Sequence, residues 1–164
     1  MTEGNQSNTP IVLDDTEVVA RALFTPEWDE RVKRGSPGCF KRNNTSVTRH
    51  AGLTFSEVVA YLKGDVEKPD KNVVVRGVGL ISVREVRSLG ETYQDPVHFG
   101  VICKPTPKNP AHAEIVPFSE PERTTTKRDV FRGLSSKICQ ALDIYVLAPD
   151  GSVEERSPPV LSVT

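Results

Sequence analysis

The sequence predicts an α+β fold, with a mostly antiparallel sheet of about five strands packed by two main helices and one short helix. Three observations predict this fold class. Short β-branched runs recur along the chain, helix-start signals and one long amphipathic segment lie between them, and the two kinds of element do not alternate strictly. Strict alternation would instead favour a parallel sheet with crossover helices.

A chain of 164 residues suits one domain with a single hydrophobic core. Its first 16 residues are polar apart from one short apolar patch at 11–13, and residues 149–164 are rich in Pro, Ser and Glu. We therefore expect flexible tails at 1–16 and 149–164 on either side of one α+β domain at 17–148.

The first predicted strand is the β-branched and aromatic run at 18–24, which Pro26 closes. Residues 27–44 contain two glycines, a proline and many charges, a composition that favours an ordered loop. The loop leads into a short predicted strand at 45–49.

The clearest local signal is a capping box. Thr54 precedes Glu57 by three residues, which predicts a helix over residues 55 to about 63, ended by a left-handed turn at Gly64. A charged turn and a strand at 73–80 follow.

Ser82 and Glu85 repeat the capping-box spacing and predict a short helix, with Gly90 just past its end. Continuation of the preceding strand is the alternative. Further strands are predicted at 97–103 and 113–118, separated by a proline-rich loop.

The last main helix is predicted to begin near Thr126, with Asp129 in its first turn, and to end near residue 142. Its apolar stripe comprises Val130, Phe131, Leu134, Ile138, Ala141 and Leu142. A final short strand at 143–148 would complete the sheet.

The charge balance is close to neutral, with 21 Lys and Arg against 22 Asp and Glu. No overall field therefore draws the chain to nucleic acid or to an anionic membrane. No apolar run approaches the roughly 20 residues needed to cross a bilayer, and the first residues lack the pattern of a signal peptide. We expect a cytoplasmic protein without a membrane partner.

The three cysteines are widely spaced and include no CxxC pair, so we expect reduced thiols rather than a disulfide framework. Cys103 and Cys139 fall on apolar faces and are predicted to be small core residues. Cys39, in a turn-like segment, is predicted to be the most exposed.

His112 and Glu114 match the H-x-E half of zinc nucleobase deaminases, in which the histidine binds metal and the glutamate moves protons. The P-C-x-x-C half is missing. The alternative is that His112 caps a strand edge and Glu114 points to solvent. We expect no metal or cofactor and favour a non-catalytic protein, and a small hydrolase using His112 and Glu114 stays open as a second hypothesis.

A basic stretch runs from Arg31 to His50 with six cations and no acid. The cations are Arg31, Lys33, Arg34, Lys41, Arg42 and Arg49. Such a stretch can bind phosphate or a carboxylate partner. A solvated loop, balanced by the acids of residues 27–30, is the alternative.

Three predicted strands also contain an arginine, namely Arg21, Arg49 and Arg76. Alternation places each arginine on the same strand face as apolar neighbours. If those faces point inward, the guanidinium groups need anions. A bound phosphate-like ligand would satisfy them, and so would internal carboxylates such as Glu57 or Glu85.

The order of the motifs ARALF, RVK, SVTR, GLT and HA, over about residues 20–142, resembles a set of small bacterial proteins of unassigned function. The resemblance implies a bacterial origin and one compact domain. It implies no activity.

Together these features predict a binding or accessory domain that recognises an anionic ligand or an acidic partner protein through the basic loop 31–42 and Arg49. The predicted ligand-binding residues are Arg31, Lys33, Arg34, Arg49, Arg21 and Arg76. A nucleic-acid-binding module is the other alternative, because Trp28 and Phe40 flank the basic loop and could stack on bases.

Overall fold

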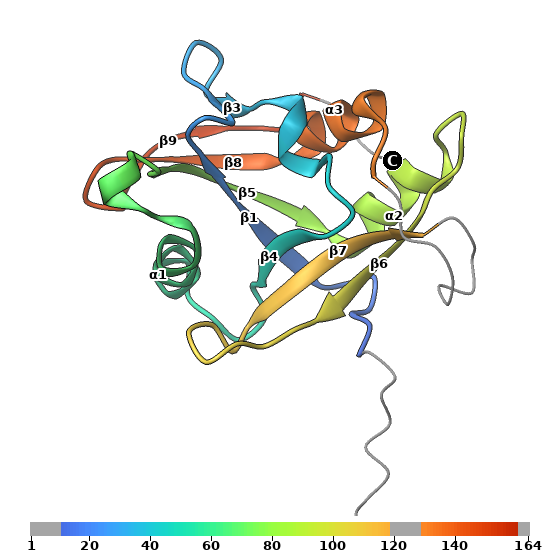
Figure 1. The fold of residues 1–164 in the computed structure, drawn as a ribbon, viewed down its shortest axis with the longest axis horizontal. Helices are drawn as coiled ribbons and strands as arrows, with labels where there is room; N and C mark the ends of the chain where they lie inside the picture. The colour runs from blue at the N-terminus through green and yellow to red at the C-terminus, as the bar shows by residue number, and fades with distance from the viewer. Residues whose placement is uncertain (1–10, 119–128, 161–164) are drawn as a thin grey trace, which may run out of the picture.

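A seven-stranded antiparallel sheet forms the centre of the fold, so the predicted α+β class is confirmed while the sheet is larger than predicted (Figure 1). The computed structural model describes residues 11–118 and 129–160. In order across the sheet, the strands are β6 (His98–Cys103), β7 (His112–Phe118), β4 (Thr45–Arg49), β1 (Val18–Phe24), β5 (Val75–Ser82), β8 (Asp143–Leu147) and β9 (Val153–Ser157).

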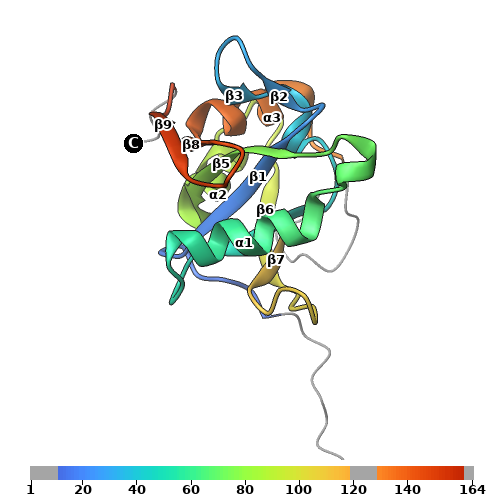
Figure 2. The same cartoon turned by 90° about the vertical axis from the view of Figure 1, so that its left-hand side faces the viewer.

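Helices cover both faces of this sheet. Helix α1 (Phe55–Val66) lies on one face, and α2 (Val83–Glu91) and α3 (Arg132–Ala141) lie on the other (Figure 2). Alternation along β1 explains the two layers, because Ala20 and Ala22 join the core under α1 whereas Val19 and Leu23 join the core under α2 and α3. None of the helices among the described residues is long and apolar enough to cross a membrane.

Helix α1 begins where the capping box predicts and continues past its predicted end. Thr54 Oγ1 accepts a hydrogen bond from the Glu57 amide at 3.2 Å, and the Glu57 carboxylate accepts from the Thr54 amide at 3.0 Å. Gly64 was predicted to stop the helix but lies inside it. A glycine costs only about 1 kcal/mol in a helix, and the helix ends at Val66, shortly before Pro69.

Helix α2 confirms the second helix-start signal, since Ser82 Oγ accepts from the Glu85 amide at 3.1 Å. Gly90 lies in the last turn of the helix rather than past its end. A side chain at Gly90 would collide with the Val97 carbonyl and the Phe99 ring. Close packing against the start of β6 therefore requires glycine here.

Helix α3 begins at Arg132, later than predicted. Asp129 and Val130 precede it without helical structure, and Thr126 lies outside the described residues. The Val130 amide donates to the Lys41 carbonyl at 2.9 Å, which attaches this segment to the basic loop instead of extending the helix.

Within the flexible tail predicted from residue 149, residues 153–157 form strand β9, which pairs with β8 at the edge of the sheet. Within the predicted N-terminal tail, Leu13 is buried and its amide donates to the Val101 carbonyl at 2.8 Å. The apolar patch at 11–13 therefore runs along the edge of β6. Residues 1–10 and 161–164 lie outside the described residues.

The predicted loop at 27–44 contains a small hairpin, β2 (Trp28–Asp29) and β3 (Arg34–Gly35), followed by the short 3-10 helix η1 (Pro37–Phe40). Phe40 is buried in the core under α2 and α3. Ser135 of α3 donates its hydroxyl to the Pro37 carbonyl, so η1 is fixed beside α3 (Figure 1).

Candidate functional site

A cavity of about 270 Å³ lies between η1, β1 and the start of β4. We call it the η1 cavity. Its wall includes Arg21 and Glu27, the backbone turn at Gly38 and Cys39, the exposed Arg42, and the polar residues 44–46. The cavity lining therefore includes two arginines and one glutamate.

Arg21 is held in the cavity wall by main-chain carbonyls. Its Nε donates to Cys39 O at 3.2 Å and its Nη1 to Ser46 O at 3.1 Å, and only 12% of its side chain is exposed. Burial lowers the pKa of Arg21, but arginine stays protonated in proteins. The result is a fixed, partly desolvated cation whose position the backbones of η1 and β4 determine.

Glu27 is the carboxylate of the cavity. Its Oε2 lies 3.7 Å from Arg21 Nη2, too far for a hydrogen bond. Among the described residues this oxygen is buried and finds no hydrogen-bond donor. Glu27 therefore offsets part of the Arg21 charge without accepting a hydrogen bond from it.

Exposed cations extend the basic surface around η1. Lys41 and Arg132 line a neighbouring cavity of about 240 Å³, and Lys41 and Arg42 line another of about 260 Å³ together with Asp129. Within the described part of the chain, no ion pair involves Lys41, Arg42 or Arg132. Arg132 comes from a segment about 90 residues after the basic loop, and only the tertiary fold brings it there.

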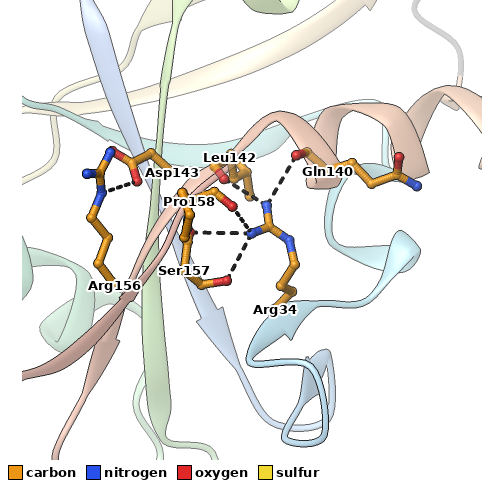
Figure 3. A network of polar contacts seen from close by, with 7 residues as sticks. All are labelled: Arg34, Gln140, Leu142, Asp143, Arg156, Ser157 and Pro158. Carbon is orange, nitrogen blue, oxygen red and sulfur yellow. Dashed lines mark hydrogen bonds and ion pairs between the residues drawn. The ribbon is translucent and has the colours of Figure 1, made fainter. Parts of the chain in front are cut away.

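Arg34, a predicted ligand-binding residue, is instead buried in a cage of oxygen atoms (Figure 3). Its Nη2 donates to the carbonyls of Cys139 and Leu142 at 2.9 and 2.7 Å, at the end of α3. Its Nη1 donates to Ser157 Oγ at 3.1 Å, at the end of β9, and to the Pro158 carbonyl at 2.9 Å, just beyond it. These contacts engage both terminal nitrogens of Arg34, so the residue joins α3 to the end of β9.

Three other predicted residues meet acids at the β2–β3 hairpin. Lys33 Nζ lies 2.8 Å and Arg76 Nη2 3.3 Å from carboxylate oxygens of Glu30, and Arg31 Nε lies 3.7 Å from Asp29. The Lys33 ammonium and the indole N–H of Trp28 lower the pKa of Glu30 to about 2. The two acids of the hairpin therefore pair with cations of the hairpin itself and of β5.

Arg49 forms a separate contact, with its Nη2 2.9 Å from Glu17 Oε1 and its Nη1 3.3 Å from Cys103 Sγ. The three strand arginines Arg21, Arg49 and Arg76 therefore contact three different acids. Internal carboxylates of Glu17 and Glu30, rather than Glu57 or Glu85, pair with Arg49 and Arg76, as the alternative hypothesis expected. Arg21 instead donates its hydrogen bonds to main-chain carbonyls and lies 3.7 Å from Glu27.

His112 and Glu114 have structural contacts. His112 Nδ1 lies 2.8 Å from Lys104 O, and Glu114 Oε1 lies 3.2 Å from Lys104 Nζ. The prediction that Glu114 points to solvent is wrong: it is buried on β7, between Ser46 of β4 and Ile102 of β6. In the described ranges, no group of three or more His, Cys, Asp or Glu side chains could hold a metal ion.

The two aromatic residues beside the basic loop are already packed. Phe40 is 1% exposed. Trp28 lies so close to Gly77 that a side chain there would collide with its ring, and its Nε1 donates to Glu30 at 2.6 Å. These contacts disfavour both rings as stacking platforms for bases.

Cys39, predicted to be the most exposed cysteine, is 2% exposed and contacts Cys139, while Cys103 is half-buried. The wrong prediction came from the turn-like local sequence, which carries no sign that η1 lies under α3.

Comparison with known proteins gives no functional assignment, since no family model, curated protein or solved structure matches the chain.

Proposed function

We propose that the protein is a non-catalytic binding protein that holds a small anionic ligand in the η1 cavity, with Arg21 and Arg42 as its contacts. The observation that supports this most is the excess of guanidinium over carboxylate in a concave, partly buried site. Guanidinium donors match phosphate and carboxylate oxygens in geometry and charge.

The fixed position of Arg21 supports the same conclusion. Its hydrogen bonds to Cys39 O and Ser46 O orient the guanidinium before any ligand arrives. A ligand therefore has less side-chain entropy to remove on binding. Arg42 is exposed and can close on the ligand from the cavity rim.

The ligand set differs from the one expected from the sequence. Lys33, Arg34, Arg49 and Arg76 already donate to internal acceptors, and Arg31 does not line the η1 cavity, so we leave these residues out. A concave site favours a small anion over an acidic partner protein, which remains the alternative occupant of the exposed rim formed by Lys41, Arg42 and Arg132. We also propose that the protein is cytoplasmic and of bacterial origin.

Calorimetric titration with inorganic phosphate and with acetate at low salt tests the proposal. We expect saturable binding of at least one anion, weakened about tenfold or more by Arg42→Ala, since one lost charge-assisted contact is worth about 1.5–3 kcal/mol. Arg84→Ala is the matched control, because Arg84 is also exposed but lies on α2. Absence of saturable binding, or equal affinity in the Arg42 variant and the wild type, would contradict the proposal.

A further inference from the structure

Two cysteines far apart in the sequence meet in the core beside the η1 cavity. Cys39 of η1 and Cys139 of α3 are 100 residues apart, and their sulfur atoms lie 2.6 Å from each other. Both side chains are buried, at 2% and 4% exposed. Cys103 does not belong to this pair, because its sulfur contacts Arg49.

The backbones on both sides of the pair are fixed. Arg21 Nε donates to the Cys39 carbonyl at 3.2 Å, and Arg34 Nη2 donates to the Cys139 carbonyl at 2.9 Å. The hydroxyl of Ser135 donates to the Pro37 carbonyl, which joins α3 to η1 next to the thiols. The fold thus holds the two sulfurs at a very high effective concentration with respect to each other.

Both cysteines are lining residues of cavities that a small reagent can enter. Cys39 lines the η1 cavity of about 270 Å³. Cys139 lines a second cavity of about 230 Å³ on the other side of η1, together with Val32 and Gln140. The two cavities therefore give a small oxidant a route toward the pair from either side of η1.

We propose that Cys39 and Cys139 are a modification site that forms a reversible intramolecular disulfide with a low-molecular-weight disulfide as oxidant. The Cys39 thiolate attacks one sulfur of the reagent, the reagent S–S bond breaks, and one small thiol leaves. Cys139 then attacks the Cys39 sulfur of the mixed disulfide and releases the second small thiol. Two protein thiols lose two electrons, the reagent gains them, and the two thiol protons pass to the released thiols.

Cys39 is assigned the first attack because the pKa of the Cys139 thiol is raised. The hydrogen bond with Cys39, and then burial, raise the pKa of the Cys139 thiol. Oxidation at neutral pH is therefore slow and accelerates as the pH rises, since the thiolate is the reactive form. The bond closes a long loop, so the oxidised chain resists denaturant better than the reduced chain.

The test treats the folded full chain with hydroxyethyl disulfide, a small and uncharged oxidant, and compares it with chain kept in dithiothreitol. In the Cys103→Ser variant, which retains both members of the pair, we expect loss of both free thiols, a mass lower by two hydrogen atoms, and a higher urea midpoint. Adding dithiothreitol restores both thiols. Adding Cys39→Ser or Cys139→Ser to that variant leaves one thiol, which can acquire only an adduct of the small thiol.

Peptide mapping of the oxidised wild-type chain tests the same disulfide without depending on whether any variant folds. We expect a linked peptide that joins the segments containing Cys39 and Cys139. Retention of both thiols in the folded Cys103→Ser chain, small-thiol adducts without the internal bond, or a bond involving Cys103 would overturn the proposal. None of these readouts depends on anion binding.

Discussion

At the scale of single residues, Arg34 determines how the C-terminal part of the chain attaches to the fold. Its terminal nitrogens donate to oxygens at the end of α3 and beyond β9 (Figure 3). A lysine keeps the charge but supplies fewer donors from a single point. We expect Arg34→Lys to lower the free energy of unfolding by about 2–4 kcal/mol in urea denaturation.

Arg31→Lys is the control for this prediction, because the Arg31 side chain is 90% exposed. We expect a change within about 0.5 kcal/mol. Equal stabilities of the Arg34→Lys chain and the wild type would show that the carbonyl cage contributes little.

Glu27 is the residue that distinguishes an anion site from a structural ion pair. Arg21 is also held by two carbonyls, so replacing the carboxylate should leave its position unchanged. We expect Glu27→Gln to raise the affinity for phosphate about two- to tenfold, because repulsion of about 0.5–1.5 kcal/mol is removed. Glu91→Gln, on the exposed end of α2, should have no effect. A weaker affinity in the Glu27 variant would mean that Glu27 positions Arg21.

The sequence predicts the cations of the basic stretch but not the residues that they contact. Arg34 and Arg42 belong to the same basic stretch, yet one is buried against carbonyls and the other exposed at a cavity. The acceptors of Arg34 lie more than 100 residues later in the chain. No local pattern encodes a contact of that kind, because main-chain carbonyls are present at every residue.

At the scale of elements, the β2–β3 hairpin is closed by Glu30, which contacts Lys33 and Arg76. The Lys33 and Trp28 hydrogen bonds lower the pKa of Glu30 from 4.5 to about 2. Because the pKa of Glu30 is lowered, its contacts stabilise the folded state fully at pH values above the ordinary pKa of 4.5. This stabilisation is lost as the pH falls through about 2. We expect a carbon-13 titration of the Glu30 carboxyl to give a midpoint near 2.

Lys33→Ala should move that midpoint upward, toward 4.5, because it removes the largest cause of the lowered pKa. The Lys68→Ala variant is the control, since Lys68 is an exposed lysine outside the hairpin. An ordinary midpoint in the wild type would mean that the hairpin is open in solution.

Elements with local signals were predictable, and elements that depend on distant contacts were not. The starts of α1 and α2 follow from caps contained within four residues. Strand β9 was missed because four of its five residues are exposed, so it lacks the apolar alternation of a half-buried strand. Its pairing with β8 comes from the open edge that β8 presents.

At the scale of the whole molecule, the candidate site is a product of the topology. Strand β1 carries Arg21 across the middle of the sheet, β4 supplies Ser46 beside it, and η1 covers both. A net charge of -1 provides no overall positive field, so attraction of an anion depends on local cations such as Arg42. The basic stretch was visible in the sequence, but the cavity required the pairing of β1 with β4.

The most direct test of anion binding in the η1 cavity is an amide NMR titration of the nitrogen-15-labelled chain with inorganic phosphate. We expect saturable shifts at the amides of Gly38, Cys39 and Ser46 and at the Arg21 Nε–H, with the amides of the β2–β3 hairpin unchanged. Shifts confined to Arg31 and Lys33, or no saturable shift at any concentration at which the chain stays folded, would contradict the account.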